Sequence, residues 1–181
     1  YNFTSCEGTK KRYLCKDLKE FFMETGYWSD EVFGERLLIS ESADQSELQS
    51  NIRAARAILA SYQELYIRIN PHTYSIGVKN PEYTIGEYLG DRKGIMSEKG
   101  ITAGFKKAKK QGCKIIVIDL DEHSLGVDPF QISKYISRRK QDFISNSIID
   151  CYVVHDGSAI RVNAKQLTRT EIESELEILK P

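Results

Sequence analysis

The stretch KIIVIDL at residues 114–120 decides the fold, because it is a continuous run of β-branched and other apolar residues that ends in Asp-Leu. Such a run is typical of a strand that is covered on both faces of a sheet. A basic helix is predicted before it at residues 100–112, and a second helix after it at residues 128–144, with Pro129 at its first position. A buried strand between two helices indicates an α/β domain.

Three more strands and a helix are predicted on the N-terminal side of this centre. Residues 46–62 repeat apolar side chains at helical spacing, and residues 64–70 alternate apolar and polar side chains. Residues 82–88 and 91–96 then read as two strands that are separated by a tight turn at Gly90.

A hairpin and a helix are predicted on the C-terminal side. Residues 148–156 and 158–163 are joined through Asp156-Gly157, which is the strongest local turn signal in the chain. The last helix begins near Thr168. The expected fold is therefore a mixed β-sheet flanked by helices, with a C-terminal β-hairpin and helix.

The first 45 residues are predicted to be a helical N-terminal extension, and residues 46–181 the α/β domain. Residues 13–25 carry apolar side chains on one helical face and are followed by Gly26, which suits the end of a helix. The sequence begins at Tyr1 rather than Met. We therefore expect the chain to be part of a longer protein.

The composition indicates a globular soluble protein, since 40% of the residues are hydrophobic and 29% are charged. No apolar run approaches the roughly 18 residues of a membrane span, so no membrane partner is expected. The four cysteines lack zinc-site spacing. Cys113 and Cys151 are predicted to be buried free thiols, whereas Cys6 and Cys15 could form a disulfide in an oxidising compartment.

Charge is distributed unevenly, although Lys+Arg and Asp+Glu are equal at 26 each. From Arg92 to Lys114 there are eight basic residues and one acidic residue, a local net charge of +7. Such a segment suits an anionic partner, and its ordinary alternative is a solvated helix face. The residues predicted to bind nucleic acid are Arg92, Lys106, Lys107, Lys109, Lys110, Arg138, Arg139 and Lys140.

The candidate chemistry lies between residues 82 and 93. Cutting a phosphodiester with a metal requires carboxylates that hold a hard cation, and a positive group near the developing charge on phosphorus. Asp91 and Lys93 are two residues apart in a predicted strand, so they point to the same face. If residues 82–96 fold as a hairpin that turns near 86–90, Glu82 comes close to Asp91. The ordinary alternative is a solvated turn at Asp91-Arg92-Lys93.

Pro81-Glu82, eight intervening residues and Asp91-Arg92-Lys93 resemble the PD-(D/E)xK motif of the restriction-endonuclease-like nucleases. The predicted order of elements resembles the αβββαβ core of that family. The segment KKAKKQGCKIIVIDL and the later hairpin are similar to the nuclease domains at the C-termini of contact-dependent growth-inhibition and other polymorphic toxins. The resemblance covers about residues 46–163, with Glu in place of Asp at position 82 and a short interval to Asp91.

The resemblance implies a role for each residue that matches the motif. Glu82 and Asp91 would be ligands of Mg²⁺ or Mn²⁺, and Lys93 would be the catalytic lysine. Glu47, near the start of the first core helix, would be an additional acidic metal ligand. Its ordinary alternative is to stabilise a helix N-terminus by its charge.

Three functions follow as hypotheses. The first is a metal-dependent endonuclease that cleaves DNA or tRNA in the cytoplasm, as the effector domain of a larger secreted or phage protein with a cognate immunity protein. The second is a metal-independent RNase of the barnase or colicin type, in which His72, Arg92 or Lys93 would do acid–base and phosphate work. The third is a catalytically inactive module that binds nucleic acid or protein.

Overall fold

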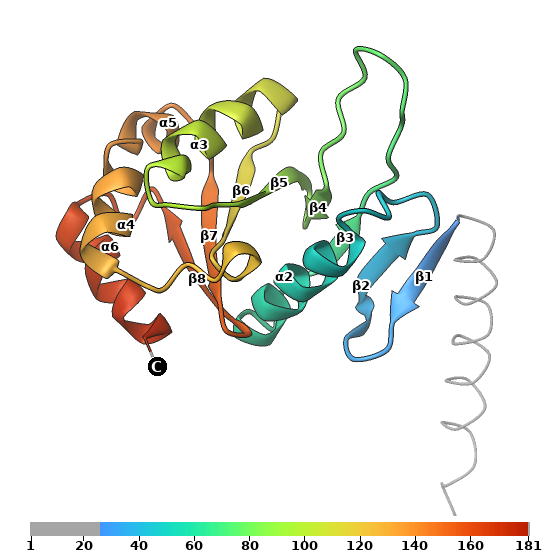
Figure 1. Ribbon diagram of the computed structural model, residues 1–181, viewed down its shortest axis with the longest axis horizontal. Helices are drawn as coiled ribbons and strands as arrows, with labels where there is room; N and C mark the ends of the chain where they lie inside the picture. The colour runs from blue at the N-terminus through green and yellow to red at the C-terminus, as the bar shows by residue number, and fades with distance from the viewer. Residues whose placement is uncertain (1–25, 181) are drawn as a thin grey trace, which may run out of the picture.

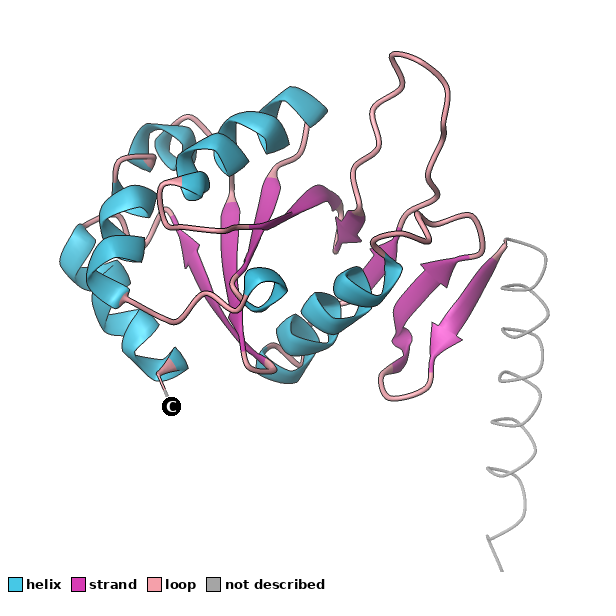
Figure 2. Ribbon diagram, viewed as in Figure 1, coloured by secondary structure: helices cyan, strands magenta, loops and turns pink. Residues whose placement is uncertain are grey.

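The computed structural model describes residues 26–180, and in this part of the chain it shows an eight-stranded mixed β-sheet flanked by helices (Figure 1; Figure 2). This confirms the predicted α/β class. In chain order the elements are β1 (Tyr27–Asp30), β2 (Gly34–Ser40), α2 (Leu48–Ser61), β3 (Ile67–Ile69), β4 (Tyr83–Ile85), β5 (Tyr88–Gly94), α3 (Gly100–Gln111), β6 (Ile115–Asp119), η1 (Asp121–His123), α4 (Pro129–Ser137), α5 (Lys140–Ile144), β7 (Asp150–His155), β8 (Ser158–Asn163), α6 (Arg169–Leu176) and η2 (Glu177–Leu179).

The strands lie in the sheet in the same order as in the chain, from β1 to β8. Neighbours β2–β3, β5–β6 and β6–β7 are parallel, and the other neighbours are antiparallel. Each parallel pair is joined by a connection that contains a helix: α2, then α3, then α4 with α5. Parallel neighbours need such a crossover, whereas antiparallel neighbours can be joined by a short turn.

The core lies on both faces of the sheet, and β6 is buried on both. Ile116 and Ile118 of β6 pack with α3, α4, α5 and α6 on one face. Ile115 and Val117 pack with α2 on the other face. Successive residues of a strand point to opposite faces, which is why one apolar run serves two layers. The prediction of a strand covered on both faces is confirmed.

The helical extension predicted for the first 45 residues is wrong for the described part of that segment. Residues 27–40 form the strands β1 and β2, and β2 pairs in parallel with β3. Leu37 and Ile39 alternate along β2 and are fully buried, so they extend the sheet core rather than a helix face. The helix predicted at residues 13–25 lies outside the described residues.

Two further boundaries differ from the predictions. The β4–β5 hairpin turns at Gly86-Glu87, where Gly86 has a φ of 57°, and Gly90 lies inside β5. A Cβ at Gly90 would lie 3.4 Å from the Cβ of Tyr83, so this glycine allows close packing and does not form a turn. The helix predicted at residues 128–144 is divided into α4 and α5.

Among residues 26–180, no helix is both long enough and apolar enough to cross a membrane. Cys113 and Cys151 are buried free thiols, as predicted, and burial raises the pKa of both. The loop between β3 and β4 spans residues 70–82. Its middle part, residues 71–80, extends as a long arm away from the sheet (Figure 1).

Candidate active site

The β4–β5 hairpin brings Glu82 and Asp91 together, although nine positions separate them in the chain. Tyr83 pairs with Gly90 in this antiparallel ladder, so the next pair outward is Glu82 with Asp91. Directly opposite residues of two strands project to the same face. The prediction that a hairpin would place these two carboxyl groups side by side is confirmed.

Lys93 completes the group, because it lies two residues beyond Asp91 on the same face of β5. Its Nζ is 2.8 Å from Oδ1 of Asp91 and 3.6 Å from Oε1 of Glu82. The backbone N–H of Arg92 donates to Oε2 of Glu82 at 2.9 Å. Glu82, Asp91 and Lys93 therefore form one ionic cluster at the start of the hairpin.

Burial and close contact shift the pKa values of the groups in this cluster. Asp91 is fully buried, and its Oδ2 accepts from no N–H group of the described residues. Burial and the neighbouring Asp91 raise the pKa of Glu82 to about 8. Burial would lower the pKa of Lys93, but the two carboxylates outweigh it and raise that pKa. Lys93 is thus a cation at neutral pH. Glu82 holds a proton there and hydrogen-bonds Asp91, and a bound metal ion would replace that proton.

The residues fit a hard divalent cation of the Mg²⁺ type. Carboxylate oxygens are its preferred protein ligands, and a buried oxygen without an N–H donor, such as Asp91 Oδ2, is the kind of group that such an ion satisfies. No group of three His, Cys, Asp or Glu side chains within residues 26–180 is arranged to hold a metal. Mg²⁺ commonly binds through one or two carboxylates and takes its other ligands from water and substrate phosphates.

Arg92 points to the opposite face of β5, where it is 2% exposed. Its guanidinium donates to Oδ1 of Asn51 at 2.6 Å, to Oδ2 of Asp119 at 2.9 Å and to Oε2 of Glu47 at 2.8 Å, and it also contacts Glu122. This arrangement corrects the prediction for Arg92, which lies in the interior and has no surface for a nucleic acid. Glu47 binds Arg92, and its charge also acts on Lys93, so its role as an additional metal ligand stays a prediction.

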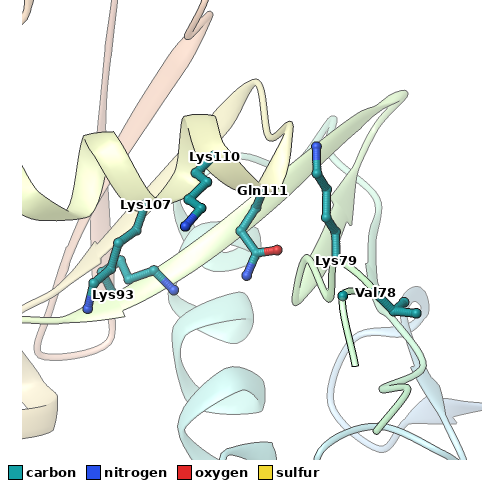
Figure 3. A pocket seen from close by; sticks show the side chains of 7 residues that line it. Val78, Lys79, Lys93, Lys107, Lys110 and Gln111 are labelled. Carbon is teal, nitrogen blue, oxygen red and sulfur yellow. The ribbon is translucent and has the colours of Figure 1, made fainter. Parts of the chain in front are cut away.

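Beside Lys93 there is a pocket of about 400 Å³ that is lined mostly by lysines. We call it the lysine pocket. It is formed by Lys93 from β5, by Lys107, Lys110 and Gln111 from α3, and by Gly77, Val78 and Lys79 from the loop before β4. Figure 3 shows the α3 side chains with Lys93 on one side and Lys79 opposite them.

The remaining basic residues predicted to bind nucleic acid are placed differently. Lys109 and Arg139 both hold Asp142, at 2.6 and 2.7 Å, and so join α3 to α5. Lys106, Arg138 and Lys140 are exposed but do not line the lysine pocket. Of the eight residues predicted for this role, Lys107 and Lys110 lie beside the candidate site.

Lys79 and Gln111 were not identified from the sequence. Gln111 has a structural contact as well, because its Oε1 accepts from the backbone N–H of Asn80 at 3.2 Å. A single lysine in an irregular loop has no periodic pattern that would mark it. The available signal was its position three residues before Glu82, which limits how far it can lie from the carboxyl pair.

No family model, curated protein or solved structure matches this chain. Function is therefore to be inferred from the site itself.

Proposed function

We propose that this chain is a metal-dependent endonuclease that cleaves phosphodiester bonds of DNA or RNA, tRNA included. The observation that carries the proposal is the position of Glu82, Asp91 and Lys93 on one face of the β4–β5 hairpin, next to the lysine pocket. Carboxylates for a hard cation and lysines for phosphate oxygens are the two requirements of metal-assisted phosphodiester hydrolysis.

The order of elements supports the same proposal. The run α2, β3, β4, β5, α3, β6 is helix, three strands, helix, strand, which is the αβββαβ order of the restriction-endonuclease-like nucleases. Glu82 directly precedes β4, and Asp91-Arg92-Lys93 lie in β5, an arrangement that supports the PD-(D/E)xK resemblance. A toxin effector domain with a cognate immunity protein remains part of this proposal.

Each residue of the cluster has a distinct role in the proposed reaction. Glu82 and Asp91 would hold Mg²⁺ or Mn²⁺, which would polarise the phosphate and lower the pKa of a bound water. Lys93 stays protonated, so its ammonium group would stabilise the negative charge on a phosphate oxygen. It also keeps Asp91 oriented through their 2.8 Å contact. Lys107 and Lys110 supply positive charge for the neighbouring phosphates.

The test is cleavage of plasmid DNA and, separately, of total tRNA, with Mg²⁺ or Mn²⁺ and with EDTA. Asp91→Asn and Lys93→Met should reduce the rate of metal-dependent cleavage by about 10²–10³-fold while leaving the circular dichroism spectrum unchanged. Lys106→Met is the matched control, because this lysine lies on α3 but does not line the lysine pocket. It should cleave at the wild-type rate.

The other outcomes identify the competing functions. Cleavage that survives EDTA would indicate a metal-independent RNase. Binding of nucleic acid without cleavage in either metal, unchanged in Asp91→Asn, would indicate a binding module.

A further inference from the structure

The arm, residues 71–80, is the one wall of the lysine pocket that lies outside the regular elements. Its two limbs, the outgoing and the returning chain, are bonded to each other near the base. The side-chain amide of Asn80 accepts from the backbone N–H of Thr73 and donates to the carbonyl oxygen of Thr73, both at 2.9 Å. The backbone N–H of Asn80 also donates to Gln111 of α3. The base of the arm is therefore fixed against the helix that carries Lys107 and Lys110.

The tip of the arm exposes apolar side chains instead of hiding them. Tyr74 is 80% exposed, and Ile76 has no contact that reduces its exposure. Val78 is 49% exposed. Exposed apolar groups gathered on one loop are typical of a surface that contacts another molecule. The ring of His72 lies 4.6 Å from that of Tyr74, measured between centroids, and supports it from the base.

The charge on the pocket walls shows what kind of molecule fits there. Lys79, Lys107 and Lys110 form no ion pair with any carboxylate of residues 26–180, whereas Lys93 is already paired with Asp91. Three ammonium groups without a carboxylate partner around one pocket repel each other, and an anion bound between them would reduce this repulsion. A second pocket of about 230 Å³ continues past Lys93 and Lys107 along α3 towards Gly100. The hollow thus extends along α3 beyond the lysine pocket, while the positive charge is concentrated at the lysine pocket.

We propose that the arm and α3 form a cleft for a single strand of nucleic acid, in which Lys79, Lys107 and Lys110 bind the phosphates that flank one nucleotide unit and Tyr74 stacks on an unpaired base. This inference rests on the proposed function and names its substrate class. Thr73 and Asn80 are bonded across the arm, so the next residues outward on the two limbs are Tyr74 and Lys79. An aromatic ring and an ammonium group on opposite limbs match the base and the backbone of one strand.

A single strand suits this cleft better than a duplex. The faces of paired bases are stacked inside a duplex, so an exposed tyrosine ring can stack only on a base that is unpaired or displaced. The lysine pocket has the volume of a small-ligand site, which corresponds to about one nucleotide unit. Loops and single-stranded ends of a folded RNA, or single-stranded DNA, present such units.

The test is fluorescence anisotropy with short labelled RNA and DNA oligonucleotides, each offered as a single strand and as a duplex, to Asp91→Asn protein in EDTA. Tyr74→Ala added to this protein should weaken single-strand binding about tenfold, and Tyr74→Phe should restore it. Lys79→Ala should reduce the slope of log affinity against log salt by about one unit, and Lys106→Ala should leave it unchanged. The RNA and DNA arms show which strand is preferred.

Equal affinity for duplex and single strand, or no effect of Tyr74→Ala, would overturn the inference even if the wild-type protein cleaves. The expected binding pattern in a protein that never cleaves would uphold the cleft and overturn the proposed function. The two failures are thus separated by comparing binding with cleavage.

Discussion

The two faces of β5 carry ionic clusters that are built in opposite ways. On the α2 side, the guanidinium of Arg92 is surrounded by Glu47, Asn51, Asp119 and Glu122, so every nitrogen has a partner. On the α3 side, Oδ2 of Asp91 accepts from no N–H group of the described residues, and Lys79, Lys107 and Lys110 have no carboxylate partner among them. The first cluster is satisfied within the chain, and the second leaves groups that a ligand could satisfy.

This difference separates residues that hold the fold from residues that serve the site, even where they are adjacent in sequence. A buried charge with all its partners stabilises one arrangement of the backbone, and removal of one partner is costly. Unsatisfied charges at a site lower stability and are retained where they bind something. Substitutions on each face of β5 test this division.

Arg92→Met should lower the free energy of unfolding by about 3–5 kcal/mol, because it removes the buried cation that Asp119, Glu47 and Glu122 share and leaves the buried Asp119 with only the partly exposed Arg53. Equilibrium urea unfolding measures it. Arg53→Met is the matched control, since Arg53 contacts the same Asp119 at 2.7 Å but is 42% exposed. It should cost less than about 1 kcal/mol. Equal losses in the two variants would remove the distinction between the faces.

Asp91→Asn should reduce the rate of metal-dependent cleavage by about 10²–10³-fold, the size expected when one electrostatic group of an active site is lost. The urea midpoint should not fall, because Glu82 lies 3.6 Å from Lys93 and, once the charge that raises its pKa is gone, replaces Asp91 as the partner of Lys93. A large loss of stability in this variant would show that the α3-side cluster is structural, like the α2-side one.

Gly94→Ala should destabilise the chain by about 1–2 kcal/mol. A Cβ at this position would lie 2.5 Å from Cδ of Glu122, which would have to leave Arg92. Gly126→Ala provides the control, because no atom lies within 4 Å of its added Cβ. Thermal melting of both variants measures the difference, since only the Cβ at Gly94 would displace Glu122 from the Arg92 cluster. A Gly94→Ala protein as stable as wild type would show that Glu122 is dispensable.

Mg²⁺ should stabilise the wild-type protein by about 1.4 kcal/mol when present at about ten times its Kd, and should not stabilise Asp91→Asn. Melting curves in Mg²⁺ and in EDTA measure the difference. Glu47→Gln should keep the shift, because Glu47 binds Arg92 on the other side of β5. If Glu47→Gln lost the shift instead, Glu47 would be a metal ligand and the division between the faces would fail at that residue.

The sequence predicted the local part of the site well. Asp91 and Lys93 share a face because strands alternate, and the Glu82–Asp91 pair needs only one hairpin. The turn was misplaced because Gly90 carries the same local signal as Gly86, and only the contact with Tyr83 in the folded chain distinguishes packing from turning.

The surroundings of Arg92 could not be predicted in the same way. Its partners Glu47, Asp119 and Glu122 lie 45, 27 and 30 positions away along the chain, on three different elements. No sequence interval of that kind marks a contact. The strands β1 and β2 were missed for a related reason, since β2 depends on pairing with β3 and packing under α2, and β1 depends on pairing with β2.

The two-residue turn of the β4–β5 hairpin has a consequence for how relatives of this chain would look. Gly86 and Glu87 are exposed and lie at the end of the hairpin away from the carboxyl pair. Residues inserted there would lengthen the loop without changing which residues face each other. The distance in sequence between the two acids is thus free to vary through evolution while their distance in space is conserved. A search for homologues should allow a gap of any length between Pro81-Glu82 and Asp91-Arg92-Lys93.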